Sequence, residues 1–265
     1  MRKEQLVLKR NEALNESTHL LTLELDPEIC AECQPGQFYN LRPLDSSAPL
    51  LRRPISICDA RPEDGEMDLL VRIVGDGTSL VCSRRPGAKL DVMGPLGNPF
   101  EIDTTKPAVM IAGGVGVAPV YFLSRRIWEA ARIEGKKAPE IHFLYGARTA
   151  SDFVLLPQIV NTVTETVLTT EDGSRGTKGF VTSVADEYLT SEYNIYVCGP
   201  SPMMQVLLDM VHAKGVSAFF SLENQMGCGV GACMGCVVPG KEGLIRVCCD
   251  GPVIPSDKLE NLLID

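Results

Sequence analysis

The chain has little of three things that often decide a protein's class: excess positive charge, histidine and long apolar runs. Lysine and arginine number 25 against 34 aspartates and glutamates, so the net charge is −9, which argues against nucleic acid or an anionic membrane as a partner. Three histidines leave little room for a histidine-rich metal site. Apolar runs reach neither the roughly eighteen residues of a membrane span nor, at the N-terminus, the length of a signal peptide. We therefore expect a cytoplasmic protein with no membrane partner.

The length and cysteine content narrow the class further. A chain of 265 residues with 45% hydrophobic residues is long enough for two domains and a small module. In a reducing compartment, its ten cysteines are better interpreted as metal ligands or free thiols than as disulfides. The distribution of these cysteines along the chain therefore carries the first functional signal.

Five of the cysteines gather near the C-terminus: Cys228, Cys233 and Cys236, followed by the adjacent pair Cys248 and Cys249. Spacings of four residues and then two match the plant-type C-x4-C-x2-C pattern of a [2Fe–2S] cluster, whose fourth cysteine comes from further along. The glycines between them allow the unusual backbone angles with which a loop can surround a cluster and present N–H groups to its sulfurs. The first three cysteines therefore read as one ligand loop.

Zinc is the rival metal for these cysteines. Structural zinc sites usually pair two C-x(2–4)-C knuckles, and here Cys233 and Cys236 would form one while Cys248 and Cys249 would have to form the other. Adjacent cysteines cannot easily direct both sulfurs at one tetrahedral ion. Inert buried thiols fit poorly in a loop so rich in glycine, so the pattern favours iron–sulfur over zinc.

Residues 1–102 are predicted to form a small antiparallel β-barrel. Leu21, Leu23 and Leu25 alternate with polar residues, residues 67–74 form another β-rich run, and turn residues bound each segment. Several short strands at this spacing, without helical periodicity between them, are typical of such a barrel. The C-x2-C formed by residues 30 and 33 has no companion pair nearby and is interpreted as two free thiols.

Two short motifs in this predicted barrel could bind a phosphorylated cofactor. Arg53, Pro54, Ile55 and Ser56 combine a guanidinium, a rigid ring and a hydroxyl, which suits phosphate binding and a hydrogen bond to a ring nitrogen. The dipeptide at 77–78, Gly-Thr, offers backbone N–H groups to a pyrophosphate. Taken alone, either motif is also explained by ordinary surface residues.

From residue 103 to about 220 the pattern changes to alternating strands and helices. Strands are predicted at residues 107–112 and 141–145, and helical spacing lies between them at residues 118–133. Further strands are predicted at 166–169, 195–198 and 218–222, with a helix at 203–213. This alternation predicts a Rossmann-like parallel sheet with helices on both faces, whose ligands bind at the carboxyl ends of the strands.

The sequence places glycines and polar groups at those carboxyl ends. Gly113, Gly114 and Gly116 form a G-G-x-G turn before the first helix, and Cys198, Gly199, Pro200 and later Glu223 follow other strands. The turn lacks the G-x-G-x-x-G pattern and an acidic residue about twenty positions on. A glycine turn that opens a helix can still bind phosphate, although a turn needed only for strand-to-helix packing explains it equally well.

Considered together, these motifs resemble the ferredoxin–NADP reductase superfamily over nearly the whole chain. Within it, the segments 222–236 and 247–253 are similar to the family of electron-transfer subunits of class 1B dihydroorotate dehydrogenases. The resemblance implies a barrel domain at 1–102 that binds FAD, an α/β domain at 103–220 that binds NAD, and a [2Fe–2S] module at 221–265.

The resemblance also implies roles for single residues. Flavin contacts would come from Arg53 to Ser56, Leu70, Val71, Arg72, Gly77 and Thr78, with the Arg53 side chain at the phosphates and Ser56 near the reactive ring nitrogen. NAD would lie along Gly113, Gly114, Gly116, Cys198, Gly199 and Pro200, with Glu223 by the nicotinamide. Cys228, Cys233, Cys236 and Cys248 would bind the cluster; the family pattern Val-Cys-x-Asp-Gly-Pro places Cys249 at its variable position.

In that family a separate catalytic subunit that carries FMN oxidises dihydroorotate, and the expected assembly is a heterotetramer with two copies of each chain. A catalytic site on a separate subunit agrees with the absence of an obvious nucleophile–base pair in this sequence, whose three histidines are scattered over predicted regular elements. Three alternatives stay open: a γ-type flavin and iron–sulfur subunit of a hydrogenase or a ferredoxin–NADP oxidoreductase, a stand-alone flavin reductase with a structural metal, and a non-enzymatic redox sensor.

Overall fold

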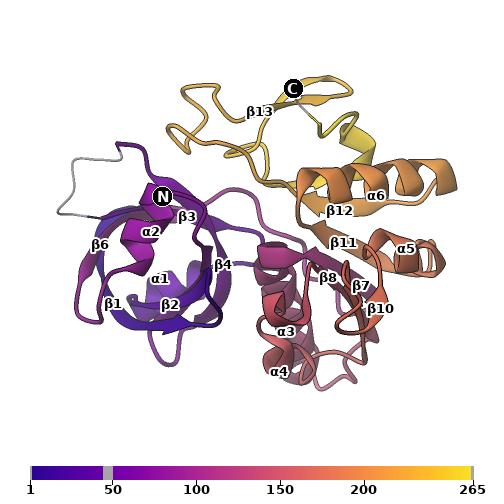
Figure 1. Ribbon diagram of the computed structural model, residues 1–265, viewed down its shortest axis with the longest axis horizontal. Coiled ribbons are helices and arrows are strands. Elements are labelled where there is room, and N and C mark those ends of the chain that lie inside the picture. Colours follow the sequence, from indigo (N-terminus) through magenta and orange to yellow (C-terminus); the bar gives the residue numbers. More distant parts are fainter. Residues whose placement is uncertain (1, 44–49, 264–265) are drawn as a thin grey trace. The chain divides into compact units, whose positions relative to one another are not determined.

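The computed structural model describes residues 2–43 and 50–263. Its chain forms two compact units, each assembled from separate stretches of sequence (Figure 1). Unit 1 contains Met1–Pro99, Asn224–Val237 and Arg246–Pro252, and unit 2 contains Phe100–Glu223, Val238–Ile245 and Val253–Asp265. The predicted boundaries at residues 102 and 220 stay predictions; the C-terminal segment contributes to both units.

Unit 1 is built around a closed six-stranded barrel with the strand order β1-β2-β5-β4-β3-β6. All its neighbouring strands are antiparallel, as predicted. Its core consists of alternating residues such as Leu21 and Leu23, which are fully buried. The strands are β1 (Arg2–Ala13), β2 (Thr18–Glu24), β3 (Phe38–Pro43), β4 (Arg53–Arg61), β5 (Glu66–Arg72) and β6 (Lys89–Leu96).

Two short helices within the barrel segment were not predicted from the sequence. Helix α1 (Pro27–Glu32) begins with a proline after Asp26, whose carboxylate accepts a hydrogen bond from the Glu28 N–H at 2.8 Å. Helix α2 (Asp76–Cys82) follows the extended residue Gly75. Because each spans less than two turns, neither leaves a recognisable helical periodicity. Gly77 of the predicted phosphate-binding dipeptide lies in the first turn of α2.

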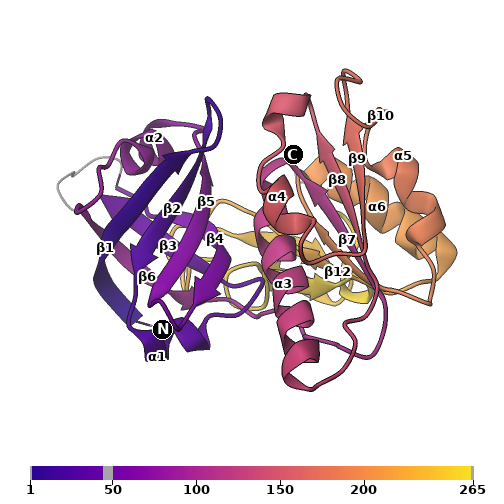
Figure 2. The same cartoon turned by 90° about the horizontal axis from the view of Figure 1, so that it is seen from below.

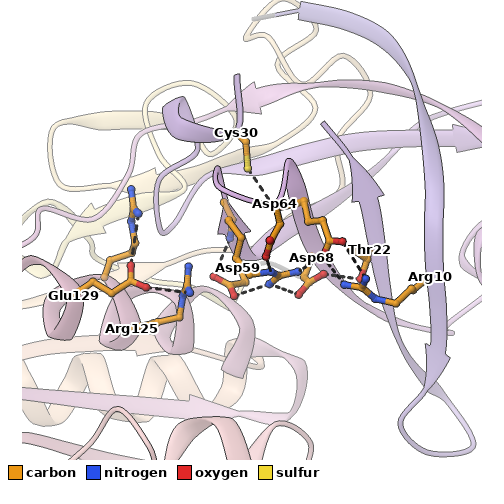
Figure 3. A network of polar contacts seen from close by, with 12 residues as sticks. Arg10, Thr22, Cys30, Asp59, Asp64, Asp68, Arg125 and Glu129 are labelled. Carbon is orange, nitrogen blue, oxygen red and sulfur yellow. Dashed lines mark hydrogen bonds and ion pairs between the residues drawn. The ribbon is translucent and has the colours of Figure 1, made fainter. Parts of the chain in front are cut away.

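A network of charges around buried carboxylates joins strands β1, β2, β4 and β5 of the barrel (Figure 3). The Arg61 guanidinium lies 2.7 Å from carboxylate oxygens of both Asp59 and Asp68, and Glu66 forms ion pairs with Lys9 and Arg10 at 2.6 and 2.5 Å. The Thr22 hydroxyl donates to Asp68 at 2.7 Å. Each buried carboxylate therefore has a cationic or hydroxyl partner, as burial of charge requires.

Unit 2 is a seven-stranded sheet with the order β10-β9-β8-β7-β11-β12-β15. Six strands run parallel, as predicted, and the edge strand β15 runs antiparallel to β12. Figure 2 shows α3 and α4 on one face and α5 and α6 on the other. The strands are β7 (Ala108–Gly113), β8 (Ile141–Ala147), β9 (Glu165–Thr170), β10 (Thr177–Lys178), β11 (Asn194–Cys198), β12 (Ala218–Ser221) and β15 (Val253–Pro255).

The helices of unit 2 begin at or near the ends of these strands. They are α3 (Val117–Ile133), α4 (Leu156–Ile159), α5 (Thr182–Ala185) and α6 (Ser201–Lys214). Strands β8 and β9 lie on one side of β7 in the sheet, whereas β11 and β12, which come later in the chain, lie on its other side. The order of the strands therefore reverses between β7 and β11. Such a reversal is where open parallel sheets bind ligands.

The C-terminal segment completes both units rather than folding beside them. Its strands β13 (Val237–Gly240) and β14 (Gly243–Arg246) form a two-stranded sheet. Strand β15 then closes the edge of the sheet of unit 2. In the part of the chain that the structure describes, no helix is long and apolar enough to cross a membrane.

Candidate redox site

Strand β4 carries the predicted flavin motif along one edge of its pairing with β3. Pro54 lies opposite Asn40 and Ser56 lies opposite Phe38; residues directly opposite on antiparallel strands share a face of the sheet. The side chains from Arg53 to Ser56 are partly exposed, whereas Ile57, the next residue, is fully buried. The motif therefore occupies the accessible end of a strand whose other end enters the barrel core.

The structure brings the two predicted phosphate-binding motifs of the barrel together. The guanidinium of Arg53 lies directly against the Cα of Gly77, where a Cβ would clash with it, and it donates a hydrogen bond to the Leu51 carbonyl. Gly77 is thus required for a close approach between helix α2 and the arginine. The positively charged side chain of Arg53 therefore contacts the first turn of α2.

The hydroxyl of Thr78 is committed to the turn itself. It accepts hydrogen bonds from the N–H groups of Val74 and Gly75, at 2.9 and 3.3 Å, and donates to the Gly75 carbonyl at 3.0 Å. Thr78 therefore shapes the loop that presents Gly77. The third flavin segment, Leu70, Val71 and Arg72, forms the end of β5, with the first two side chains buried and Arg72 partly exposed.

The cysteine loop lies in unit 1, with sulfurs that accept backbone hydrogen bonds. Cys228 Sγ accepts the N–H groups of Val230 and Cys233 at 3.4 Å each, and Cys248 Sγ accepts the Gly231 N–H at 3.1 Å. Gly229 and Gly231 have φ of +73° and +77°, which glycine adopts without strain. This is the geometry that the interspersed glycines predicted: a loop whose N–H groups point at sulfur.

The hydrogen bonds shift the acidity of these thiols in opposite directions. Burial opposes ionisation of Cys228, but bonds from the N–H groups of Val230 and Cys233 outweigh it and lower the pKa of the thiol to about 6. Burial, followed by the bond with Cys236, raises the pKa of Cys248 to about 12. Thiolate is the form that binds metal, and the lowered pKa favours that form at Cys228.

The cysteines are arranged in two pairs. Cys228 hydrogen-bonds with Cys233, and Cys236 with Cys248. Across residues 2–43 and 50–263, no group of three or more histidine, cysteine or acidic side chains is gathered closely enough to surround one metal ion. Four cysteines that share two irons need meet only two to each iron, and the paired arrangement fits that donor set.

The adjacent Cys248 and Cys249 occupy different environments. Cys248 is buried, with its sulfur toward Cys236 and the Gly231 N–H. Cys249 is partly exposed, and its sulfur lies over the Cα of Gly231, 2.6 Å from where a Cβ would be. The two neighbouring side chains therefore face different sides of the loop.

In unit 2 the two predicted NAD motifs pack against each other at the reversal of the sheet. A Cβ on Gly116 would lie 2.5 Å from the Cys198 carbonyl, and one on Gly113 would lie 2.9 Å from the ring of Pro200. Gly114, with φ of +54°, has nothing within 4 Å of its open side. Two of the glycines thus permit close packing, and the third leaves its backbone accessible.

Glu223 and Cys198 share one electrostatic environment at the carboxyl ends of β12 and β11. Glu223 is exposed, whereas Cys198 is buried. Burial raises the pKa of the Cys198 thiol, and the nearby Glu223 carboxylate raises it further. Cys198 is therefore a neutral thiol, and desolvation by the surrounding protein also raises the pKa of the Glu223 carboxyl.

Sequence reasoning missed Asn40, a buried polar residue of β3. Its side chain lies against Gly229 of the cysteine loop. The sequence offered little signal, because the strand also carries Arg42 and polar residues are common on one face of a barrel strand.

Comparison with known proteins identifies the domains of this chain. Three family models match: an oxidoreductase FAD-binding domain over residues 5–100, an oxidoreductase NAD-binding domain over 110–209, and the iron–sulfur cluster binding domain of dihydroorotate dehydrogenase B over 223–260. The chain is thus an oxidoreductase that uses FAD, NAD and an iron–sulfur cluster, as predicted.

Relatives over the full length identify the family. The chain is 38% identical over 267 residues to the dihydroorotate dehydrogenase B (NAD(+)) electron transfer subunit of Geobacillus sp. (strain WCH70), covering 98% of this chain and 99% of the relative. It is 40% identical to the corresponding subunit of Bacillus cereus (strain Q1), covering 84% and 85%. It belongs to the family of dihydroorotate dehydrogenase B electron transfer subunits.

Solved structures agree with the fold. The structure of an NADH-dependent reduced ferredoxin–NADP oxidoreductase matches with a TM-score of 0.82 at 27% identity, over 96% of this chain and 89% of that chain. The ferredoxin reductase in carbazole 1,9a-dioxygenase matches with a TM-score of 0.68 at 26% identity, over 81% and 66%. The predicted barrel and Rossmann-like sheet are confirmed as the architecture of flavin-dependent reductases.

Proposed function

We propose that this chain passes electrons between NAD and the FMN of a partner subunit that oxidises dihydroorotate, by way of a [2Fe–2S] cluster and FAD. The observation that supports this most directly is the pairing of four cysteines in the same unit as the flavin strand β4. A bound flavin supplies the conversion between the electron pair that NAD exchanges as hydride and the single electrons that a cluster accepts.

The residues of the barrel would bind and orient the FAD. Arg53 and the N–H groups near Gly77 would neutralise its phosphates, with Leu70, Val71 and Arg72 along the cofactor and Pro54 and Ile55 beside the ring. Ser56 would donate a hydrogen bond to the reactive ring nitrogen. The contact between Arg53 and Gly77 supports this assignment, because both groups already meet.

The reversal of the sheet in unit 2 would receive NAD. The accessible backbone at Gly114 would approach the pyrophosphate, with Gly113, Gly116, Cys198, Gly199 and Pro200 shaping the surface beneath it. Glu223 would position the nicotinamide, and its exposure leaves it free to do so. The neutral Cys198 adds no charge to the site.

Cys228, Cys233, Cys236 and Cys248 would bind the two irons in the pairs described above. Cys248 is favoured over Cys249 because its sulfur faces Cys236 and accepts an N–H bond. Backbone bonds to ligand sulfurs stabilise the added charge of a reduced cluster. All ten cysteines are free thiols, which supports a reducing, cytoplasmic location.

The loop around the cysteines would dock the partner, in an assembly of two copies of each chain. Val230 and Met234 are 42% and 47% exposed and flank the exposed Cys233; exposed apolar groups of this kind are often covered by a partner. Met226, two residues before Cys228, is buried and does not belong to this surface. The docking surface is therefore Val230, Cys233 and Met234.

Aspartate at Val230 and Met234 tests the docking surface. The double variant should lose at least about tenfold in affinity for the catalytic subunit, because charge is placed in an apolar contact, while its FAD and iron contents stay unchanged. Ile133→Asp, at an 87% exposed position in α3, is the matched control. Binding of the double variant with unaltered affinity would contradict this surface.

Reconstitution tests the proposed reaction. The chain mixed with the FMN-containing catalytic subunit should form NADH from NAD⁺ and dihydroorotate, whereas neither chain alone should do so. The likeness to an NADH-dependent reduced ferredoxin–NADP oxidoreductase supports one other candidate, a ferredoxin-linked subunit. Ferredoxin-dependent turnover without any dihydroorotate-dependent turnover would favour that candidate, and full activity of the chain alone with bound zinc would favour a stand-alone flavin reductase.

A further inference from the structure

Asn40 is a buried polar side chain without a hydrogen bond among the described residues. It is 1% exposed, and neither its amide nitrogen nor its amide oxygen has a partner there. A buried amide without partners is costly. Asn11, on β1 of the same barrel, shows the usual arrangement: its nitrogen donates to the carbonyls of Cys82 and Arg84, both at 2.7 Å.

The position of Asn40 sets it between the two redox motifs of unit 1. In the pairing of β3 with β4 it lies opposite Pro54 of the flavin motif, so the two side chains share a face of the sheet. Its amide nitrogen lies against the bare Cα of Gly229, the residue after Cys228, and a Cβ there would clash with it. Leu96 borders the same place.

The donor end of the amide therefore points toward the cysteine loop. Pro54, its neighbour on the flavin strand, has no N–H and no polar side-chain atom to pair with it. The N–H groups of Val230 and Cys233 already reach Cys228 Sγ from the loop itself. A sulfur-rich centre bound by this loop would offer the acceptor that the amide lacks.

We propose that Asn40 is a positioning residue that donates a hydrogen bond to a sulfur atom of the bound iron–sulfur centre and thereby raises its reduction potential. The inference rests on the proposed function, since it requires that the cysteine loop bind a cluster. A donor to sulfur stabilises the reduced cluster, which carries the additional negative charge, more than the oxidised one. Asn40 thus tunes the transfer of electrons between cluster and flavin from a position on the barrel.

A redox titration of the cluster tests this role. Asn40→Leu keeps the side-chain volume and removes the donor. In the FAD- and cluster-loaded chain of this variant, the ratio of reduced to oxidised cluster at a fixed potential should fall about tenfold, as measured by electron paramagnetic resonance. This corresponds to a reduction potential lower by about 59 mV for one electron. The flavin potential should change much less. Asn40→Asp has the same shape and lacks the donor, so it should also lower the reduction potential of the cluster. This variant is titrated if Asn40→Leu incorporates no cluster.

Asn11→Leu is the matched control, because it removes partnered hydrogen bonds from the same barrel. It should lower the melting temperature and leave the cluster potential unchanged, whereas Asn40→Leu should not lower the melting temperature of the cofactor-free chain. An unchanged cluster potential in both Asn40 variants, or a shift confined to the flavin, overturns the inference. A wild-type chain that binds flavin but no iron and sulfide overturns the proposed function instead.

Discussion

Gly231 separates the roles of Cys248 and Cys249. Its N–H donates to Cys248 Sγ at 3.1 Å, while the open side of its Cα faces the sulfur of Cys249. One glycine therefore contacts both adjacent cysteines, through different atoms. The sequence could not choose between the two from spacing, and this relationship supports Cys248 as the fourth ligand.

Serine substitutions test that assignment. Cys248→Ser should abolish the iron–sulfur absorption or greatly reduce it, because one iron would lose half of its protein ligands. Cys249→Ser should keep iron and sulfide at the wild-type level. Iron, sulfide and visible absorption are measured on anaerobically purified chains, and a cluster lost only in the Cys249 variant would reverse the assignment.

Gly231→Ala should disrupt the cysteine loop. The φ of +77° is strained for alanine, and the new Cβ would lie 2.6 Å from Cys249 Sγ, so the N–H bond to Cys248 should be displaced. We expect lower iron content with FAD retained. Gly87→Ala is the control: φ there is +90° and nothing lies within 4 Å of the new Cβ, so it should cost about 1 kcal/mol and leave the iron content unchanged. Equal iron content in both variants would show that the loop tolerates the clash.

The neighbouring arginines 52 and 53 should respond differently to alanine substitution. Arg53→Ala should weaken FAD binding about tenfold to a hundredfold, the worth of a hydrogen bond to a charged group. Arg52 lies 2.5 Å from the buried Asp91, so Arg52→Ala should mainly lower the stability of the barrel. Flavin retention during dialysis and thermal melts separate the two effects. Loss of flavin only in the Arg52 variant would contradict the assignment of Arg53 to the phosphates.

The stability of the barrel should depend on pH through Glu66. Hydrogen bonds from Arg10, against the opposing effect of burial, lower the pKa of Glu66 from 4.5 to about 2. A depressed pKa stabilises the folded state above pH 4.5, and this contribution is lost as the pH falls from about 4.5 toward 2. Because Lys9 and Arg10 are about half exposed, solvent screening limits the contribution of Glu66 to the free energy of unfolding to roughly 1–2 kcal/mol.

Glu66→Gln should therefore reduce the free energy of unfolding near pH 7, and the difference from wild type should shrink as the pH falls below about 4.5. Urea unfolding followed by circular dichroism at several pH values measures it. Asp64→Asn is the control, since Asp64 is exposed and lies 3.8 Å from Arg61. A difference that stays constant down to pH 3 would show that the ionised carboxylate is not the stabilising group.

The sequence predicted those parts of the fold that have strong periodicity. The helix expected at residues 118–133 is α3, Val117–Ile133, and the strand expected at 195–198 is β11, Asn194–Cys198. Helices α1 and α2 escaped detection because they are too short to show a period. The antiparallel β15 depends on a pairing with β12 more than thirty residues earlier, which local patterns do not encode.

In the candidate site, too, local patterns predicted only part of what the structure shows. Glycine and cysteine spacing predicted a loop whose N–H groups point at sulfur, and short motifs pointed to Arg53 and Gly77 separately. Their contact, the orientation of Cys248 and the unpartnered Asn40 all arise from tertiary packing. Residue types thus predicted the chemistry, while the partners of each residue became visible only in the structure.

An anaerobic reductive titration of the purified chain with dithionite tests whether electrons enter both a flavin and an iron–sulfur cluster. We expect about three electrons per chain, two for FAD and one for a [2Fe–2S] cluster, with bleaching of both flavin and iron–sulfur absorption. Uptake of about two electrons, with flavin bleaching alone and zinc in place of iron and sulfide, would contradict electron transfer through the cysteine loop.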